Sequence, residues 1–86
     1  MADFMHYEVN AGPANTIEVE VDRQANVLLM DRPNFNAYRS RRSYRYRGGL
    51  VRQSPVHLTP PHSGTWHVVI DLGGARGYLN TVCRVL

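Results

Sequence analysis

The sequence has one cysteine, no lysine and no long hydrophobic run, and the first and last of these features each exclude a class of protein. The single cysteine, Cys83, cannot form an internal disulfide, so the chain is not a disulfide-stabilised secreted scaffold. No stretch approaches the roughly 18 apolar residues of a membrane-spanning helix. The N-terminus has an acid at Asp3 and lacks the apolar core of a signal peptide. We therefore expect a cytoplasmic protein without a membrane span.

What is present is the composition of an ordinary small globular domain. A chain of 86 residues is near the lower size at which one domain buries enough surface to fold alone. With 43% hydrophobic and 20% charged residues, the sequence is neither disordered nor a coiled coil. Residues 1–86 are therefore expected to form a single domain.

Apolar and polar residues alternate along most of the chain with the two-residue period of β-strands. In the clearest case, Ile17, Val19 and Val21 face one way and the intervening acids face the other. The expected strands are Phe4–Val9, Thr16–Asp22, Ala25–Met30, Ser43–Arg47, Pro55–Thr59, Thr65–Leu72 and Tyr78–Val85. About seven short strands with turn signals between them predict an all-β fold. We expect a small sandwich or jelly-roll-like barrel of mostly antiparallel strands.

Turn signals suggest how these strands connect. The apolar run Ala25–Met30 is expected to be buried on both faces and to pair with the strand before the turn at Asp22–Gln24. Gly48-Gly49 is expected to interrupt the fourth strand in a tight turn or bulge. The last two strands are expected to form a hairpin with its turn at Gly73–Gly77. The one irregular segment has the pattern of a helical turn near Asn34–Tyr38.

The most distinctive segment is Arg32–Arg52, which carries seven arginines and no acidic residue, whereas residues 1–31 hold six acids and one arginine. Guanidinium groups bind phosphate or carboxylate oxygens through paired donors, and neighbouring tyrosines can stack on bases or sugars. On a strand, however, Tyr44 and Tyr46 face away from the neighbouring arginines, which weakens the case for base stacking. The expected anion-binding residues are Arg39, Arg41, Arg42, Arg45, Arg47, Arg52 and Tyr38.

The arginines also have two interpretations that need no binding site. If the strand carrying Glu18, Glu20 and Asp22 lies beside one carrying Arg45 and Arg47, the opposite charges pair on a solvated face. Each such pair contributes a few tenths of a kcal/mol to about 1 kcal/mol. A composition bias also accounts for ten arginines and no lysine.

The sequence shows no catalytic or metal-binding constellation. The four histidines lack the close spacing of a zinc site, since no two are closer than five positions and His62 and His67 flank a turn into a strand. Cys83 shares a face of the last strand with Thr81 and Val85 and has the pattern of a packing residue. Asp31 and Asp71 each follow an apolar run and are expected to cap or close turns. We expect no enzymatic activity, no metal and no cofactor.

Several motifs resemble those of a known family. They are Gln24-Ala25-Asn26-Val27, Leu29-Met30-Asp31, Asn34-Phe35, Tyr38, Gly48-Gly49, Ser54-Pro55-Val56 and the run from Trp66 to Gly74. With them the chain resembles, over nearly its whole length, the bacterial family of domain of unknown function 1883. The resemblance implies a small all-β domain, either stand-alone or joined to a Toll/interleukin-1 receptor (TIR) domain, with no established activity. It also implies a recognition or sensing role, with a TIR-domain protein as an expected partner.

The sequence therefore favours a non-enzymatic recognition module that binds an anionic ligand, either nucleic acid, a nucleotide or an acidic protein. One alternative is a structural or assembly protein that acts by self-association as a homo-oligomer through exposed strand edges. Another is a carbohydrate-binding module, because Ser63-Gly64-Thr65-Trp66 followed by Gly73-Gly74 resembles the last hairpin of sugar-binding jelly-roll domains. Trp66 itself is expected to be a core residue.

Overall fold

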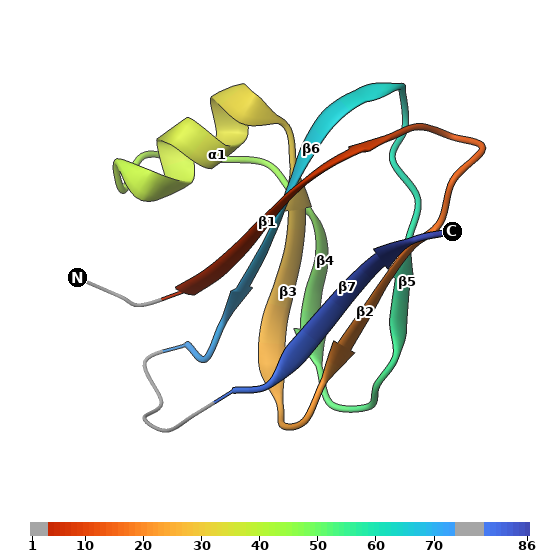
Figure 1. The fold of residues 1–86 in the computed structure, drawn as a ribbon. Helices are drawn as coiled ribbons and strands as arrows, with labels where there is room; N and C mark the ends of the chain where they lie inside the picture. Colours follow the sequence, from red (N-terminus) through yellow and green to blue (C-terminus); the bar gives the residue numbers. More distant parts are fainter. Residues whose placement is uncertain (1–3, 74–78) are drawn as a thin grey trace.

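The computed structural model describes residues 4–73 and 79–86, and these residues form seven strands in two sheets and one short helix (Figure 1). The strands are β1 (Phe4–Ala11), β2 (Ile17–Val21), β3 (Ala25–Met30), β4 (Arg47–Val51), β5 (Val56–Leu58), β6 (Gly64–Asp71) and β7 (Thr81–Val85). The helix α1 (Arg32–Arg39) lies between β3 and β4 in the chain. The expected all-β fold is confirmed as two open antiparallel sheets and not as a closed barrel.

The molecule has three layers. The larger sheet has the strand order β1-β6-β3-β4, and the smaller sheet has the order β5-β2-β7. The smaller sheet packs against one face of the larger sheet, and α1 lies against the opposite face (Figure 1). The larger sheet is therefore the central layer, covered on both sides.

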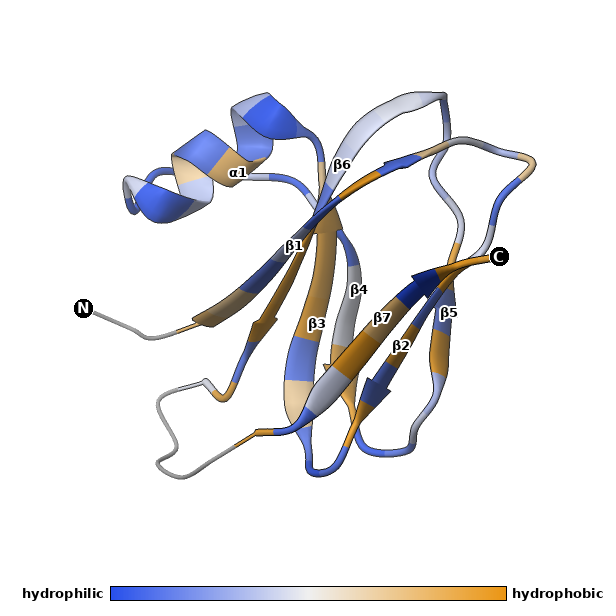
Figure 2. Cartoon of the chain, viewed as in Figure 1, coloured by the Kyte–Doolittle hydropathy of each residue, from blue (hydrophilic) through white to orange (hydrophobic). Residues whose placement is uncertain are grey.

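Side chains alternate between the two faces along the strands of the central sheet. The strands therefore contribute residues both to the interface with the smaller sheet and to the interface with α1. On β6, Trp66, Val68 and Ile70 pack between the two sheets, whereas Val69 packs towards α1, and all four are buried. The prediction that Ala25–Met30 is buried on both faces is confirmed, and Figure 2 shows β3 as hydrophobic along most of its length. A central strand covered on both sides needs an apolar residue at nearly every position, which explains the continuous run.

Two expected strand pairings are wrong. The segment Asp22–Gln24 carries the chain from the smaller sheet to the larger one, so β3 pairs with β6 and β4 and not with β2. Likewise, β7 pairs with β2, whereas β6 pairs with β1 and β3, so the last two strands form no hairpin. Most of the turn expected at Gly73–Gly77 lies outside the described residues. Alternation predicts the face that a residue occupies, but it contains no information about the neighbouring strand.

The fourth strand also differs from its expected position. It covers Arg47–Val51 and contains Gly48-Gly49, so the glycines do not interrupt it. Gly48, with φ of 108°, lies so close to the carbonyl oxygen of Val27 on β3 that any side chain would collide with that oxygen. Upstream, the N–H of Arg45 donates to Asn34 Oδ1 at 2.7 Å and not to a neighbouring strand.

The expected helical turn is a helix of two turns. Its N-cap is Asp31, whose Oδ1 accepts hydrogen bonds from the backbone N–H of Asn34 at 3.1 Å and from its side chain at 2.7 Å. Pro33 lies in the first turn, where no backbone donor is needed. Asp71 also acts as expected, because its Oδ1 accepts from the N–H of Gly73 at 2.9 Å. Within the described part of the chain, no helix has the length and apolar character needed to cross a membrane.

Candidate functional site

The arginines predicted to bind anions are exposed, and they follow one continuous course from the end of α1 to the end of β4. Arg39 ends the helix, the next four lie in the segment between α1 and β4 or at the start of β4, and the last follows β4 directly. We call this set the arginine surface: Arg39, Arg41, Arg42, Arg45, Arg47 and Arg52.

No carboxylate pairs with the arginine surface among the residues that the structure describes. Two arginines elsewhere do pair with acids: Arg32 lies 3.9 Å from Glu8, and Arg84 lies 2.8 Å from Glu18 and 2.5 Å from Glu20. The expectation that Arg45 and Arg47 neutralise the acids of β2 is therefore wrong. The reason is topological: β2 belongs to the smaller sheet, whose neighbouring strand β7 supplies Arg84 instead.

Local hydrogen bonds hold the segment between α1 and β4 against the helix. The backbone N–H of Arg42 donates to the carbonyl of Ala37 at 2.9 Å, and Arg41 adopts a left-handed conformation with φ of 59°. The bond from Arg45 to Asn34 ties the far end of the segment to the first turn of α1. The side chain of Arg39 donates to Asn36 Oδ1 at 2.7 Å, and its guanidinium carbon lies 4.7 Å from the centre of the Phe35 ring. The arginines thus project from a supported backbone.

Tyr38, also predicted to bind the ligand, is engaged in packing. Its hydroxyl donates to Asp71 Oδ2 at 2.7 Å, and its ring meets those of Phe4 and Tyr44 edge-on at 5.2 and 5.1 Å. Burial and the Asp71 carboxylate raise the pKa of the Tyr38 hydroxyl. The more accessible ring is that of Tyr46, which is 50% exposed and tilted against Tyr44 at 5.7 Å. The sequence pattern did not single out Tyr46, because it placed Tyr44 and Tyr46 together on one face of a strand.

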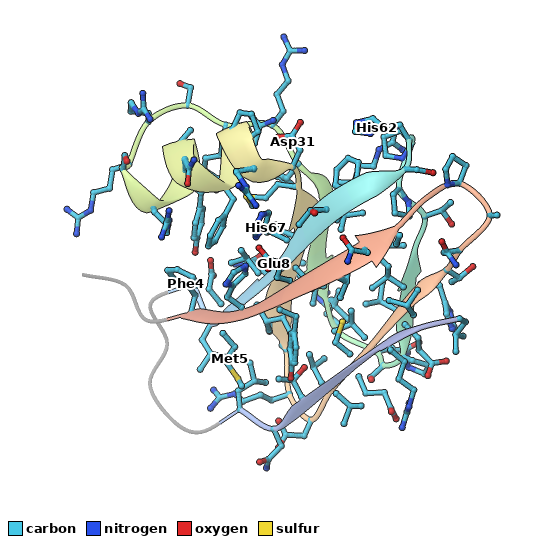
Figure 3. All side chains as sticks on the ribbon, turned by 45° about the horizontal axis from the view of Figure 1, so that its top comes forward. Phe4, Met5, Glu8, Asp31, His62 and His67 are labelled. Carbon is cyan, nitrogen blue, oxygen red and sulfur yellow. The ribbon has the colours of Figure 1, made fainter. Side chains whose placement is uncertain are left out.

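A second polar cluster lies on the outer face of the central sheet, and sequence reasoning missed it. His6 Nε2 and His67 Nδ1 are hydrogen-bonded at 2.7 Å, and both rings stack on Phe35 of α1 at 4.2 and 4.5 Å. His67 is only 3% exposed, and its Nε2 has no hydrogen-bond partner among the described residues. Glu8 Oε1, on the neighbouring strand β1, lies 4.0 Å from this nitrogen (Figure 3).

Burial lowers the pKa of both His6 and His67, because a desolvated imidazole resists taking up a proton. Glu8 raises both pKa values and Arg39 lowers both, but neither effect is as large as burial. The two histidines come together because of the register in which β1 pairs with β6. Alternation along each strand does not predict that register.

Other candidate residues have structural surroundings. Cys83 is half-buried, and burial raises the pKa of its thiol, so it packs as expected and is a poor nucleophile. Trp66 is 4% exposed, and its indole N–H donates to the carbonyl of His62 at 3.0 Å, which confirms it as a core residue. Its buried ring cannot stack on a sugar. In the described ranges, no three His, Cys, Asp or Glu side chains gather as metal ligands do.

Comparison with known proteins identifies a family without identifying an activity. The model of the family described as "Domain of unknown function (DUF1883)" matches residues 2–86, nearly the whole chain. No curated protein and no solved structure matches the chain.

Proposed function

The chain belongs to the DUF1883 family of domains of unknown function, and from this starting point we propose that it is a non-enzymatic recognition module that binds an anionic partner through the arginine surface. The observation that carries the proposal is that six exposed arginines lie along one course without a carboxylate partner in the described residues. Unpaired charges of one sign create a field that attracts anions.

The chemistry of the partner follows from the guanidinium group. Its planar fork matches the oxygens of phosphates and carboxylates, so the candidates are nucleic acid, a nucleotide or an acidic protein. Stacking on bases has little support, because Tyr38 and Tyr44 pack against each other and Tyr46 alone of the three is half exposed. The proposed binding therefore depends on charge and falls as salt rises.

We base a proposed cellular location and a proposed partner on the cysteine content and on the family resemblance. A single cysteine fits the cytoplasm, where thiols remain reduced. A TIR-domain protein is a proposed partner on the basis of the family resemblance.

Self-association is the second candidate, and exposed apolar residues near the C-terminus favour it. At the C-terminal end of the chain, Val82, Val85 and Leu86 are 43%, 40% and 59% exposed, on or directly after the edge strand β7. Size exclusion over a range of protein concentrations tests this candidate, because a fixed monomeric size contradicts it.

The test of anion binding compares wild type with the variant Arg41→Gln/Arg42→Gln/Arg45→Gln/Arg47→Gln. Heparin and single-stranded DNA serve as probes at low and moderate salt. We expect the variant to bind at least about tenfold more weakly, with a salt dependence of log K reduced by ~0.7 for each lost phosphate contact on single strands. Thermal unfolding should change little, because exposed charges contribute little to stability.

A matched pair of single variants separates position from net charge. Arg45→Gln and Arg84→Gln each remove one positive charge, but Arg84 lies on the smaller sheet and already pairs with Glu18 and Glu20. We expect Arg45→Gln to weaken heparin binding more than Arg84→Gln does. Equal binding by wild type and the four-arginine variant would refute the proposal.

A further inference from the structure

The strand β4 has an open edge. Among the residues that the structure describes, β4 is the last strand of the central sheet and pairs there with β3 alone. Arg47, Gly48 and Leu50 of β4 are exposed, and Leu50 is 52% exposed. The unpaired backbone groups of such an edge can form a ladder with another extended chain.

The side chains of β4 leave room for an added strand. Gly48 and Gly49 present no side chain, and a Cβ on Gly49 would point into space with no atom within 4 Å. The register pairs Gly48 with Leu28 and Leu50 with Asn26, so these residues of β4 share the face that also carries α1. Leu50 is thus an exposed apolar residue beside bare backbone, where the side chain of an added strand could pack.

The charges around this edge indicate which class of partner could bind there. Arg45 and Arg47 lie at one end of β4 and Arg52 at the other, and none has a carboxylate partner in the described ranges. The five steps along the chain from Arg47 to Arg52 span about 17 Å at the strand rise of ~3.3 Å per residue. An extended segment of that length with acidic residues at both ends matches this spacing.

A second copy of the chain and nucleic acid fit this edge less well. The β4 edge of a second copy would bring arginines against arginines, and like charges across a strand pair are destabilising. Nucleic acid could neutralise the arginines, but its backbone lacks the alternating amide donors and carbonyl acceptors that complete a β ladder.

We propose that β4 is a docking edge for an extended acidic segment of a partner protein, which adds to the central sheet as a fifth strand. This inference rests on the proposed function, because the same arginines supply the attraction. It goes further in naming the class of partner and its backbone contacts. Main-chain hydrogen bonds provide affinity in this mode of recognition, and the flanking arginines provide selectivity for acidic ends.

The test uses two peptides of equal charge, with capped termini. The peptide EEVTVTVEE can form a strand, whereas EEVPVPVEE has the same acidic ends but lacks two central backbone donors. We expect the first to bind and the second to bind at least about tenfold more weakly, a difference of about 1.4 kcal/mol. Amide chemical shifts measured on the ¹⁵N-labelled protein should change mainly at residues 47–51.

Two variants with the same change in charge provide the control on the protein. Leu50→Asp places an acid on the β4 edge, whereas Val82→Asp places one on β7 of the smaller sheet, at a residue with 43% exposure. We expect Leu50→Asp to weaken binding of EEVTVTVEE at least about tenfold and Val82→Asp about twofold or less. Circular dichroism verifies that both variants fold.

The outcomes separate this inference from the proposed function. If heparin binds but the two peptides bind equally or not at all, the docking edge is refuted and anion binding stands. Shift changes confined to β1 or β7 also refute the docking edge. If neither heparin nor either peptide binds, both proposals are refuted.

Discussion

At the scale of single residues, the most unusual feature is a buried histidine with an unsatisfied ring nitrogen. His67 bonds to His6 through Nδ1 and its ring stacks on Phe35, but its Nε2 has no hydrogen-bond partner among the described residues. Desolvation lowers the pKa of both imidazoles from the ordinary histidine value of 6.5. The pair therefore links the stability of this part of the fold to pH.

The direction of this pH dependence follows from the two pKa shifts. Well above pH 6.5, the ordinary pKa of histidine, both side chains are neutral in the folded and unfolded chain, and the full stability is present. As pH falls below 6.5 and through the lower folded pKa values, the unfolded chain binds more protons and stability is lost. The loss of stability begins as the pH approaches the pKa of histidine in the unfolded chain. It is complete below the pKa values of His6 and His67 in the folded chain.

We predict that His67→Leu removes part of this loss. A leucine of similar volume leaves stability at pH 7.5 within about 1.5 kcal/mol of wild type. Between pH 7.5 and 5, the variant should lose less stability than wild type, as measured by urea denaturation midpoints. Met30→Leu, a volume-conserving change in the same cluster, is the control and should retain the wild-type dependence on pH. An unchanged slope in His67→Leu would show that this histidine is not responsible.

At the scale of elements, α1 is attached to the central sheet mainly through one side chain. The helix has only eight residues, too few to be stable alone in water. Phe35 is its one buried residue, and its ring stacks on His6 and His67 and meets Phe4 edge-on at 6.2 Å. The bond from Tyr38 to Asp71 adds a polar attachment one turn later. Since the backbone of Arg42 and Arg45 is bonded to α1, this packing also positions part of the arginine surface.

We predict that Phe35→Ala destabilises the protein by about 3 kcal/mol or more, as is usual for truncation of a buried phenylalanine. Amide hydrogen exchange should show lost protection in α1 with retained protection in β2 and β7, because those strands lie in the other sheet. Asn36→Ala, which removes only a bond to the exposed Arg39, should change stability by less than about 0.5 kcal/mol. Equal loss of protection in all elements would contradict a local role for Phe35.

At the scale of the whole molecule, a single core joins the two sheets. Ile17 and Val19 of β2 and Val68 and Ile70 of β6 are each 0% exposed within it. The radius of gyration of the Cα atoms, 12.1 Å, is close to the ~12 Å expected of a compact domain of this length. The layers also separate charge, because Arg84 and its acidic partners lie on the smaller sheet and the arginine surface begins at α1 on the other side of the central sheet.

We predict that Ile70→Ala destabilises the whole domain by about 2–5 kcal/mol, through lost burial and the cavity left behind. That is a large share of the roughly 5–10 kcal/mol expected for a domain of this size. The fluorescence of Trp66, buried in the same core, should report a single unfolding transition at lower denaturant. Val82→Ala on the exposed surface is the control and should have little effect. A stability loss below about 1 kcal/mol for Ile70→Ala would contradict the central role of this core.

The sequence by itself determined which residues are inside and which are outside, because alternation is a local property of each strand. It predicted the inward face of β2, the core position of Trp66 on β6, the doubly buried β3 and the cap at Asp31. It also identified the arginines that are exposed between α1 and the end of β4.

Only the tertiary structure decided which strands are neighbours, because pairing joins residues far apart in the chain. The pairing of β2 with β7 places Arg84 beside Glu18 and Glu20. Arg45 and Arg47 therefore have no ionic partners among the described residues. The tertiary structure also brought His6 of β1 against His67 of β6, bound the Tyr38 hydroxyl to Asp71, and left β4 at the edge of the central sheet. The residues that make up the candidate surface can thus be read from the sequence. That its arginines have no carboxylate partners among the described residues is a consequence of the strand topology.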